Sequence, residues 1–198
     1  MTLHQWGTLS YREAEKRMQE VHRRAVEDAE NHLIYCSHPE IFTVGHNDTR
    51  SWPVPVYRCS RGGSITAHSE GQAVLYFCFQ AEKPALFYRN VLRAYDTFFS
   101  KLLPNVSYNK AQPGYYIENR KIASLGFRYS HAVSLHGVAL NVDVDLDFHA
   151  QVNPCGLEGI VPTSLCSEGI DLTVAEVNQH LSQIISEVFG DPIVKTQG

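Results

Sequence analysis

Three stretches of the chain repeat apolar residues every three or four positions, the spacing that places side chains on one face of a helix. The first stripe consists of Tyr11, Ala14, Met18, Val21, Ala25 and Ala29. The second follows Pro84 and consists of Phe87, Val91, Tyr95, Phe98 and Leu102. The third consists of Val177, Leu181, Ile184, Ile185 and Val188. Ser10 with Glu13, and Thr173 with Glu176, have the spacing of capping boxes. We therefore predict three helices.

Short apolar runs, separated by glycine, proline or polar residues, fill the sequence between these stripes, and such runs are typical of strands. They cover residues 33–36, 41–44, 54–59, 73–79, 115–117, 122–128 and 137–144, with a turn expected at Asn119-Arg120. Because helices and strands alternate only in part, we predict an α+β fold with a mixed sheet rather than a regular doubly wound fold.

Length and composition narrow the class of protein. The chain has 198 residues, of which 43% are hydrophobic and 19% charged, with a formal net charge of −4. These values predict one globular domain over residues 1–198, with a core at about 10–190 and a short tail at 191–198. We see no apolar run of ~18 residues and no secretory signal, so we expect a cytoplasmic protein without a membrane partner. The negative charge weighs against a nucleic-acid partner.

The five cysteines, at positions 36, 59, 78, 155 and 166, are odd in number and form no C-x-x-C pair, so we expect free thiols. Cys36 and Cys78 lie in strand-like runs, where a free cysteine is usually a small apolar filler. Cys155 differs, because Pro154 fixes the backbone before it and Gly156 leaves room around the sulfur. We interpret Cys155 as a candidate nucleophile at a loop apex.

Two further segments are candidates for chemistry. Residues 61–68 combine an arginine, two adjacent glycines, hydroxyls and a histidine, and paired glycines allow close backbone approach to a ligand or simply a tight turn. Lys121 enters an apolar strand with small neighbours. A lysine that points into such a pocket needs an anion or loses its proton more easily, whereas a solvent-facing strand lysine does neither.

In this order, the segments resemble the lipoate-protein ligase B family, the octanoyl-[acyl-carrier-protein]:protein octanoyltransferases. The resemblance covers roughly residues 10 to 190. It rests on four motifs: Arg61-Gly62-Gly63-Ser64-Ile65-Thr66-Ala67-His68 with Gly71-Gln72 and Tyr76; Lys121-Ile122-Ala123-Ser124-Leu125-Gly126; residues 136–142; and Pro154-Cys155-Gly156. The family usually has H-G-P-G-Q where this chain has His68-Ser69-Glu70-Gly71-Gln72, which leaves the path of that loop open.

The resemblance implies a fold similar to the catalytic domains of biotin and lipoate ligases, with a mixed sheet, a smaller sheet and flanking helices. It implies transfer of an octanoyl group from acyl carrier protein to a lysine of lipoyl domains, those of 2-oxoacid dehydrogenases and of the glycine cleavage H protein. This is the first step of endogenous lipoate synthesis. It passes through a cysteine thioester and needs no cofactor, neither ATP nor a metal.

The resemblance also assigns roles to residues. Cys155 matches the acyl-thioester nucleophile, and Lys121 matches the lysine that lowers the pKa of that thiol and serves as its acid/base partner. The lining of the acyl site matches Arg61, Gly62, Gly63, Ser64, Ile65, Thr66, Ala67, His68, Ser124, Leu125, Gly126, Gly137, Val138 and Ala139. His38, His68 and Tyr76 match polar residues grouped around the dyad. We expect Ile65, Leu125, Val138 and Tyr76 to line an apolar groove for the acyl tail.

Two other functions remain open at this point. An ATP-dependent lipoate or biotin ligase would use a similar fold and a lysine but no cysteine nucleophile. A non-catalytic acyl-binding domain would keep an apolar pocket without the Cys155 and Lys121 pair. The ten histidines and five cysteines show no paired spacing of a structural zinc site.

Four arginines near the motifs suggest a positively charged rim for acidic protein partners. They are Arg58, Arg61, Arg120 and Arg128.

Overall fold

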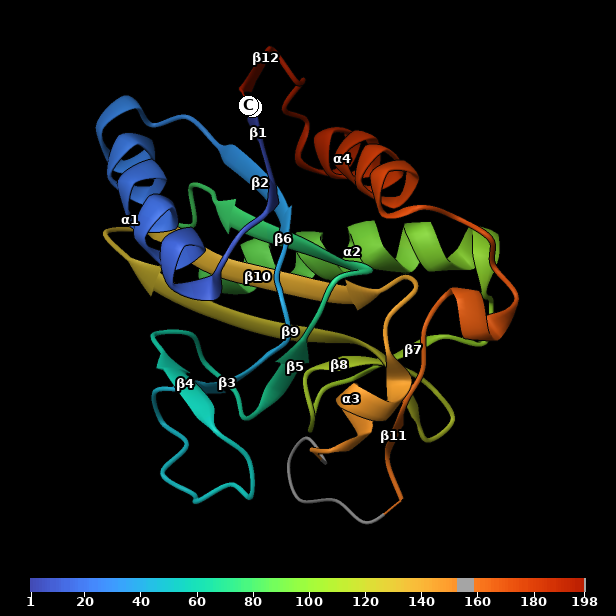
Figure 1. Cartoon of the computed structure of the whole chain (residues 1–198). Coiled ribbons are helices and arrows are strands. Elements are labelled where there is room, and N and C mark those ends of the chain that lie inside the picture. The colour runs from blue at the N-terminus through green and yellow to red at the C-terminus, as the bar shows by residue number, and fades with distance from the viewer. Residues whose placement is uncertain (153–158, 198) are drawn as a thin grey trace.

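A large mixed β-sheet forms the centre of the molecule (Figure 1). The computed structural model describes residues 1–152 and 159–197. The strands of this sheet are β1 (Thr2–Thr8), β2 (His32–Ser37), β6 (Gln72–Cys78), β7 (Ser107–Asn109), β8 (Gly114–Ile117), β9 (Arg120–Ser130), β10 (Val133–Asn141), β11 (Val161–Pro162) and β12 (Lys195–Gln197). Their order is β12-β1-β2-β6-β10-β9-β8-β7, and β11 pairs with β9. Strand β1 is parallel to β2 and β12, whereas β2, β6, β10, β9, β8 and β7 pair antiparallel.

A smaller sheet of three strands lies beside the large one (Figure 1). It consists of β3 (Ile41–Gly45), β4 (Val56–Cys59) and β5 (Thr66–His68), with β3 parallel to β4 and antiparallel to β5. Strand β4 is shorter than the predicted residues 54–59, because Pro55 has no N–H group to contribute to a ladder.

The three predicted helices are present as α1 (Tyr11–Asp28), α2 (Pro84–Leu102) and α4 (Val174–Phe189), together with a short α3 (Leu146–Ala150) and a 3-10 turn (Cys166–Glu168). Thr173 and Glu176 form the complete capping box at the start of α4. At α1, Ser10 accepts from the Glu13 amide, but the Glu13 carboxylate accepts from Arg17 at 2.9 Å instead of closing the box. The predicted α+β architecture, with a mixed sheet, a smaller sheet and flanking helices, is confirmed.

Helices cover both faces of the large sheet (Figure 1). Strand β6 is buried along its whole length, which explains its continuous apolar sequence. Its residues alternate between two cores, with Leu75 and Phe77 packed among residues of α2 and α4 and Val74 and Tyr76 packed against α1. No helix within the described part of the chain is long and apolar enough to cross a membrane.

Some boundaries differ from the sequence-based prediction. Strand β1 was not predicted, and the turn between β8 and β9 lies at Glu118-Asn119 rather than Asn119-Arg120, with Glu118 in the left-handed region at φ 55°. Strand β10 begins and ends earlier than the predicted residues 137–144. Its end is set by Gly71, whose carbonyl accepts the amides of Val142 and Asp143.

Candidate active site

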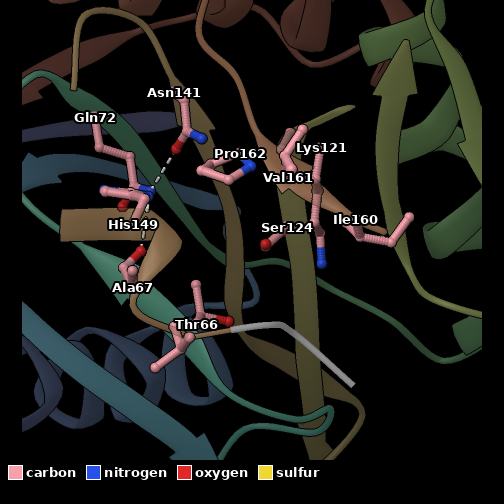
Figure 2. A pocket seen from close by; sticks show the side chains of 12 residues that line it. Thr66, Ala67, Gln72, Lys121, Ser124, Asn141, His149, Ile160, Val161 and Pro162 are labelled. Carbon is pink, nitrogen blue, oxygen red and sulfur yellow. Dashed lines mark hydrogen bonds between the residues drawn. The ribbon is translucent and has the colours of Figure 1, made fainter. Parts of the chain in front are cut away.

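Two adjoining cavities lie between the large sheet and strand β5 of the smaller one. The first is about 400 Å³, and Figure 2 shows the side chains that line it, including Lys121, Gln72 and Asn141. The second is about 310 Å³ and has a wall of strands β9 and β10. Thr66 and Ser124 line both cavities, so the two lie next to each other.

Lys121 extends into the first cavity from the start of β9 (Figure 2). The residue is only 9% exposed, and its Nζ lies 5.6 Å from the centre of the Tyr116 ring. Its side chain runs across Gly114 of the neighbouring strand, where a Cβ would lie 2.8 Å from the lysine Cε. Of the two alternatives for Lys121, a pocket or a solvent-facing strand position, the structure shows the pocket.

The predicted nucleophile lies outside the described residues, because Cys155 falls within residues 153–158. The chain on either side of that segment lines the first cavity. Val152 precedes it and Ile160 follows it, and both border the cavity that holds Lys121.

Two of the predicted lining segments are cross-strand partners in the second cavity. Strands β9 and β10 place them in direct register, as the pairs Ser124–Ala139, Leu125–Val138 and Gly126–Gly137. Gly137 is required by close packing, because a Cβ there would lie 1.9 Å from the Leu75 carbonyl oxygen of β6. Leu125, Val138 and Tyr76 line this cavity, as the predicted acyl groove requires.

Some of residues 61–68 line the cavities, and the others pack in the structure around them. Arg61, Thr66, Ala67 and His68 line the cavities. Gly62, Gly63, Ser64 and Ile65 are not part of the described lining. Ile65 is 2% exposed and packs in the core of the smaller sheet with Phe42 and Val44, and its place in the acyl groove stays a prediction.

The paired glycines join the two sheets. The Gly62 amide donates to the Phe127 carbonyl of β9 at 3.1 Å, and Gly63 adopts φ 82°. A Cβ on Gly45 of β3 would lie 2.1 Å from the Gly63 carbonyl oxygen. Ser64 lies on the outer side of this loop, where its hydroxyl donates to Asp48 at 2.8 Å.

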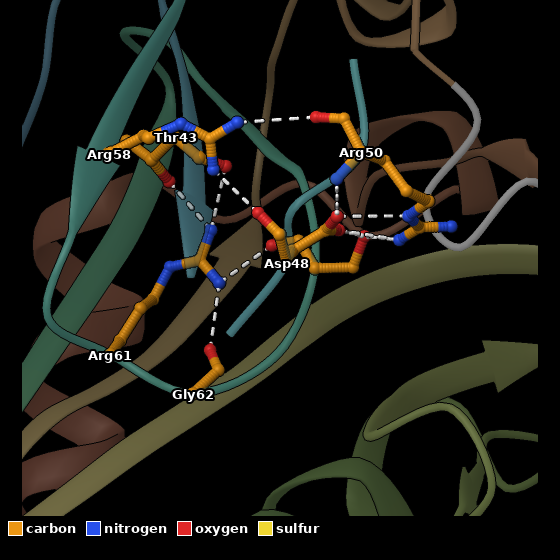
Figure 3. A network of polar contacts seen from close by, with 7 residues as sticks. Thr43, Asp48, Arg50, Arg58, Arg61 and Gly62 are labelled. Atoms are coloured by element: carbon orange, nitrogen blue, oxygen red, sulfur yellow. Dashed lines mark hydrogen bonds and ion pairs between the residues drawn. The ribbon is translucent and has the colours of Figure 1, made fainter. Parts of the chain in front are cut away.

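Arg61 is a buried structural cation (Figure 3). It is 7% exposed, and its guanidinium donates to the carbonyls of Thr43, Gly62 and Ser64 and to the Thr43 hydroxyl at 2.8–2.9 Å. Asp48 beside it pairs with Arg50, and this ion pair holds the pKa of the Asp48 carboxyl well below its usual range.

The predicted polar group gathers beside the second cavity. His38 and Tyr76 share a hydrogen bond of 2.8 Å, and the His38 and His68 rings lie 5.5 Å apart. Burial lowers the pKa of both histidines and raises that of Tyr76. Tyr11 of α1, which sequence analysis assigned only to a helix stripe, packs 5.3 Å from the His68 ring and lines the same cavity. These side chains are therefore neutral near pH 7.

Residues 68–72, whose path the sequence left open, are held by contacts with residues 143–149. Ser69 is buried and its hydroxyl lies 2.9 Å from His149 Nε2. Gly71 has φ 82°, and a Cβ there would lie 1.9 Å from the Asp143 carbonyl oxygen, so this glycine is required. Glu70 is exposed.

Sequence analysis missed several residues of the site. Gln72, Asn141 and His149 all line the first cavity. A signal was present for the first two, because both are polar residues within apolar strands. His149 gave no local signal. His136 lines the second cavity with a left-handed φ of 62°, and burial lowers its pKa to about 3.

The predicted arginine rim is partly wrong. Arg61 is buried, as described above. Arg120 pairs with Glu168 at 2.8 Å and with Glu118 at 3.1 Å, so its charge is offset. Arg58 and Arg128 are exposed.

One group of side chains has the geometry of possible metal ligands. Ligand atoms of Asp28, Glu30 and His32 lie within 4.8 Å of one another. Asp28 ends α1, His32 begins β2 and Glu30 lies in the connection between them, and none of the three lines either cavity. Both nitrogens of His32 are engaged, one with Asp28 at 3.2 Å and one with His4 at 3.0 Å.

Comparison with known proteins gives consistent results. Residues 10–186 match the family described as lipoyl protein ligase A/B catalytic domain. The chain is 34% identical over 167 residues to an octanoyltransferase of Nitrosococcus oceani, covering 80% of this chain and 75% of that protein. It is 32% identical over 184 residues to an octanoyltransferase of Pseudomonas fluorescens, covering 88% and 86%.

Solved structures share the fold at lower identity. A bi-partite lipoate protein ligase from Thermoplasma acidophilum superposes with a TM-score of 0.75 at 15% identity, covering 100% of this chain and 87% of that one. A biotin protein ligase from Leishmania major gives a TM-score of 0.54 at 11% identity, covering 94% and 71%. The expected likeness to lipoate and biotin ligases is confirmed for the fold.

Proposed function

Since this chain belongs to the lipoate-protein ligase B family and is an octanoyltransferase of lipoate metabolism, we propose that it takes octanoyl groups from acyl carrier protein and transfers them to lysines of lipoyl domains through a thioester on Cys155. The acceptors are the lipoyl domains of 2-oxoacid dehydrogenases and the glycine cleavage H protein. The reaction supplies the octanoyl precursor of lipoate in the cytoplasm, and neither ATP nor a metal takes part.

One observation carries this proposal. The buried Lys121 lies in a cavity that Val152 and Ile160 also line, and these residues flank the segment that contains Cys155. The arrangement supports a pairing of the Cys155 thiol with the Lys121 amine.

The first half-reaction needs a thiolate. A free thiol with a pKa of ~8.5 is only about 3% ionised at pH 7. An ammonium beside the sulfur favours the ionised form, and Lys121 supplies that charge where little water can screen it. The thiolate attacks the octanoyl carbonyl carbon, and the carrier sulfur leaves with the electron pair of its C–S bond. It takes a proton from the Lys121 ammonium, so the carrier departs as a thiol and Lys121 is left as a neutral amine. A thioester is already activated, so this exchange needs no nucleotide.

The second half-reaction forms the amide. The incoming lysine amine attacks the enzyme thioester and must lose a proton as the C–N bond forms. With the thiolate acylated, Lys121 has lost its anionic partner and serves as the base. The Cys155 sulfur then leaves as a thiolate, which restores the starting pair.

The second cavity suits the acyl chain. Leu125, Val138 and Ala139 give it an apolar wall, and the histidines and tyrosines opposite are neutral. Each methylene buried there contributes about 0.8 kcal/mol, so the cavity favours chains that fill it.

Arg61 weighs against an ATP-dependent ligase mechanism. Its guanidinium already donates to three carbonyls and a hydroxyl, so a bidentate contact to a phosphate would require breaking at least one of these bonds. In this chain the Arg61-Gly62-Gly63 segment therefore has a structural role, because it links the smaller sheet to the large one.

Intact mass analysis tests the proposal. Mixing the protein with octanoyl acyl carrier protein, without ATP, is expected to add one octanoyl group, mapped to the peptide that contains Cys155. Adding a lipoyl domain should discharge the adduct onto that domain. Cys155→Ser should form no thioester. Transfer by the Cys155→Ser protein that depends on ATP would establish the ligase alternative, and binding without any adduct would establish the non-catalytic one.

Lys121 variants separate the two half-reactions. Lys121→Met should slow adduct formation at pH 7 at least roughly thirtyfold, the ratio of full to ~3% ionisation of a thiol. Lys121→Arg keeps a positive charge but is a far weaker base, so it should retain adduct formation better than discharge. Equal loss of both steps in Lys121→Arg would contradict the assigned base.

A further inference from the structure

Asn141 occupies an unusual position for a polar side chain. It is the last residue of β10, lies directly opposite Gln72 of β6, and is only 7% exposed. Its amide borders the cavity that holds Lys121 (Figure 2).

The orientation of the Asn141 amide is fixed by its surroundings. Asn141 Nδ2 donates to the Thr163 carbonyl at 2.9 Å, and Asn141 Oδ1 accepts from Gln72 Nε2 at 2.9 Å. Gln72 Nε2 also donates to the Ala67 carbonyl at 3.3 Å. Because backbone carbonyls can only accept, they fix which end of each amide is nitrogen. A flipped Asn141 would place two oxygens against each other at Thr163.

A buried chain of hydrogen bonds holds Gln72 in turn. Arg61 donates to the Thr43 hydroxyl, which donates to His68 Nε2 at 3.1 Å. His68 Nδ1–H then donates to Gln72 Oε1 at 2.8 Å. Burial keeps the pKa of His68 well below its usual range, so this tautomer persists at neutral pH. Every bond in the chain runs in one direction, from Arg61 towards Asn141.

One proton of Asn141 remains available. A primary amide has two N–H donors, and Thr163 accepts one of them. The second has no acceptor among the residues that the structure describes, although the side chain is almost fully buried beside the cavity.

We propose that the second Nδ2 proton of Asn141 binds the carbonyl oxygen of the acyl group and stabilises it as an oxyanion. This inference rests on the proposed function. As the thiolate forms its bond to the carbonyl carbon, the π electron pair moves onto oxygen, and Asn141 donates to that oxyanion. When the carbonyl re-forms, the bond to the carrier sulfur breaks, and that sulfur leaves with the electron pair and takes up a proton.

The same donor acts in the second half-reaction. The acceptor amine forms its C–N bond, the oxygen again becomes an oxyanion, and its collapse breaks the C–S bond to the enzyme while the amine proton passes to the base. Asn141 is neutral and loses no proton in either step, and the bonds from Gln72 and to Thr163 hold it in place beforehand. Preorganised donors of this kind are effective because they need no reorientation during the reaction.

Substitution of Asn141 tests the proposal. Removing one oxyanion donor typically lowers kcat about 10²–10³-fold, so Asn141→Ala should lose activity on this scale for both half-reactions, with little change in KM for the octanoyl donor. The apparent pKa values of the pH–rate profile should stay unchanged, because Cys155 and Lys121 remain. Asn178→Ala is the matched control, since Asn178 is a buried asparagine of α4 that lines neither cavity.

An aldehyde inhibitor separates catalysis from packing. Octanal adds to a thiolate and places its oxygen where the oxyanion forms, whereas octane fills the acyl cavity and has no oxygen. Asn141→Ala should weaken inhibition by octanal by about the same factor as kcat and leave inhibition by octane within threefold. Equal weakening of both inhibitors, or a kcat within threefold of the wild type, would overturn the proposal.

A measurement on the wild type covers the case in which the variant does not fold. On addition of octanal, one side-chain amide proton of Asn141 should move downfield in the ¹⁵N–¹H spectrum while its geminal partner stays in place. If both protons stay in place, the proposal is wrong. A wild type that forms no octanoyl adduct with acyl carrier protein would refute the proposed function instead.

Discussion

Burial keeps several histidines neutral, among them His149 and His136 beside the cavities and His4 on β1. Burial lowers the pKa of His4 and of His149 to about 4 and that of His136 to about 3. In an unfolded chain a histidine titrates near 6.5. Between these values the unfolded chain binds protons that the folded protein does not. Each such histidine therefore contributes stability above pH 6.5 that is lost as the pH falls.

We expect the free energy of unfolding to decrease steadily from pH 7 to pH 4. Urea unfolding at several pH values measures this slope. His149→Gln should make the slope shallower over the same range, because one depressed pKa is removed. A protein that gained stability between pH 6.5 and pH 4 would show that these histidines are protonated in the folded state.

At the scale of elements, the sequence predicted the helices, whose hydrogen bonds are local, better than the strands, whose partners lie far away along the chain. The helices α1, α2 and α4 lie where their apolar stripes placed them, because helix hydrogen bonds join residues four apart. At α1 the agreement is incomplete, since the capping box is not closed and Ala29 of the stripe follows the end of the helix. Strand β1 gave no comparable signal, since its pairing depends on β2 and β12, about 30 and 190 residues away. The site followed the same rule. The strand that carries Lys121 left a pocket position and a solvent-facing position open, and the family resemblance chose between them. The contact between Gln72 and Asn141 follows only from the β6–β10 register.

The capping box of α4 allows a direct test of one local signal. Thr173→Ala removes the hydroxyl that accepts from the Glu176 amide at 3.2 Å. We expect a loss of about 1 kcal/mol in the free energy of unfolding, with activity unchanged. Thr173→Ser keeps the hydroxyl and should lose much less. Equal losses in both variants would assign the effect to the methyl group rather than to the cap.

At the scale of the whole molecule, the chain has a formal net charge of −4 but still exposes individual arginines that could attract an acidic partner. Arg128 lies on β9 beyond the second cavity and is exposed, with no ion-pair partner in residues 1–152 or 159–197. Arg58 is also exposed, but it donates to the Asp48 and Arg50 carbonyls and so supports the loop that carries them. Arg128 is therefore the cleaner position for testing attraction of an acidic partner.

Arg128→Glu should raise KM for octanoyl acyl carrier protein several-fold at low salt, with kcat nearly unchanged. The difference should shrink with added salt, because the Debye length falls from about 10 Å at 0.1 M to about 3 Å at 1 M. Arg89→Glu, on exposed α2 surface, is the control with the same charge change. If both variants behave alike, net charge rather than this position governs binding.

The burial of Arg61 has a consequence for how the enzyme responds to its medium. No carboxylate pairs with its guanidinium among the residues the structure places, and the cation is almost wholly out of contact with solvent. Mobile counterions cannot gather around it as they do around Arg128. Its electric field therefore acts on the adjoining cavities at nearly constant strength in dilute buffer and in brine. We therefore expect the rate of the chemical steps in the cavities to depend little on salt concentration, whereas binding of a charged partner at the surface depends on it strongly.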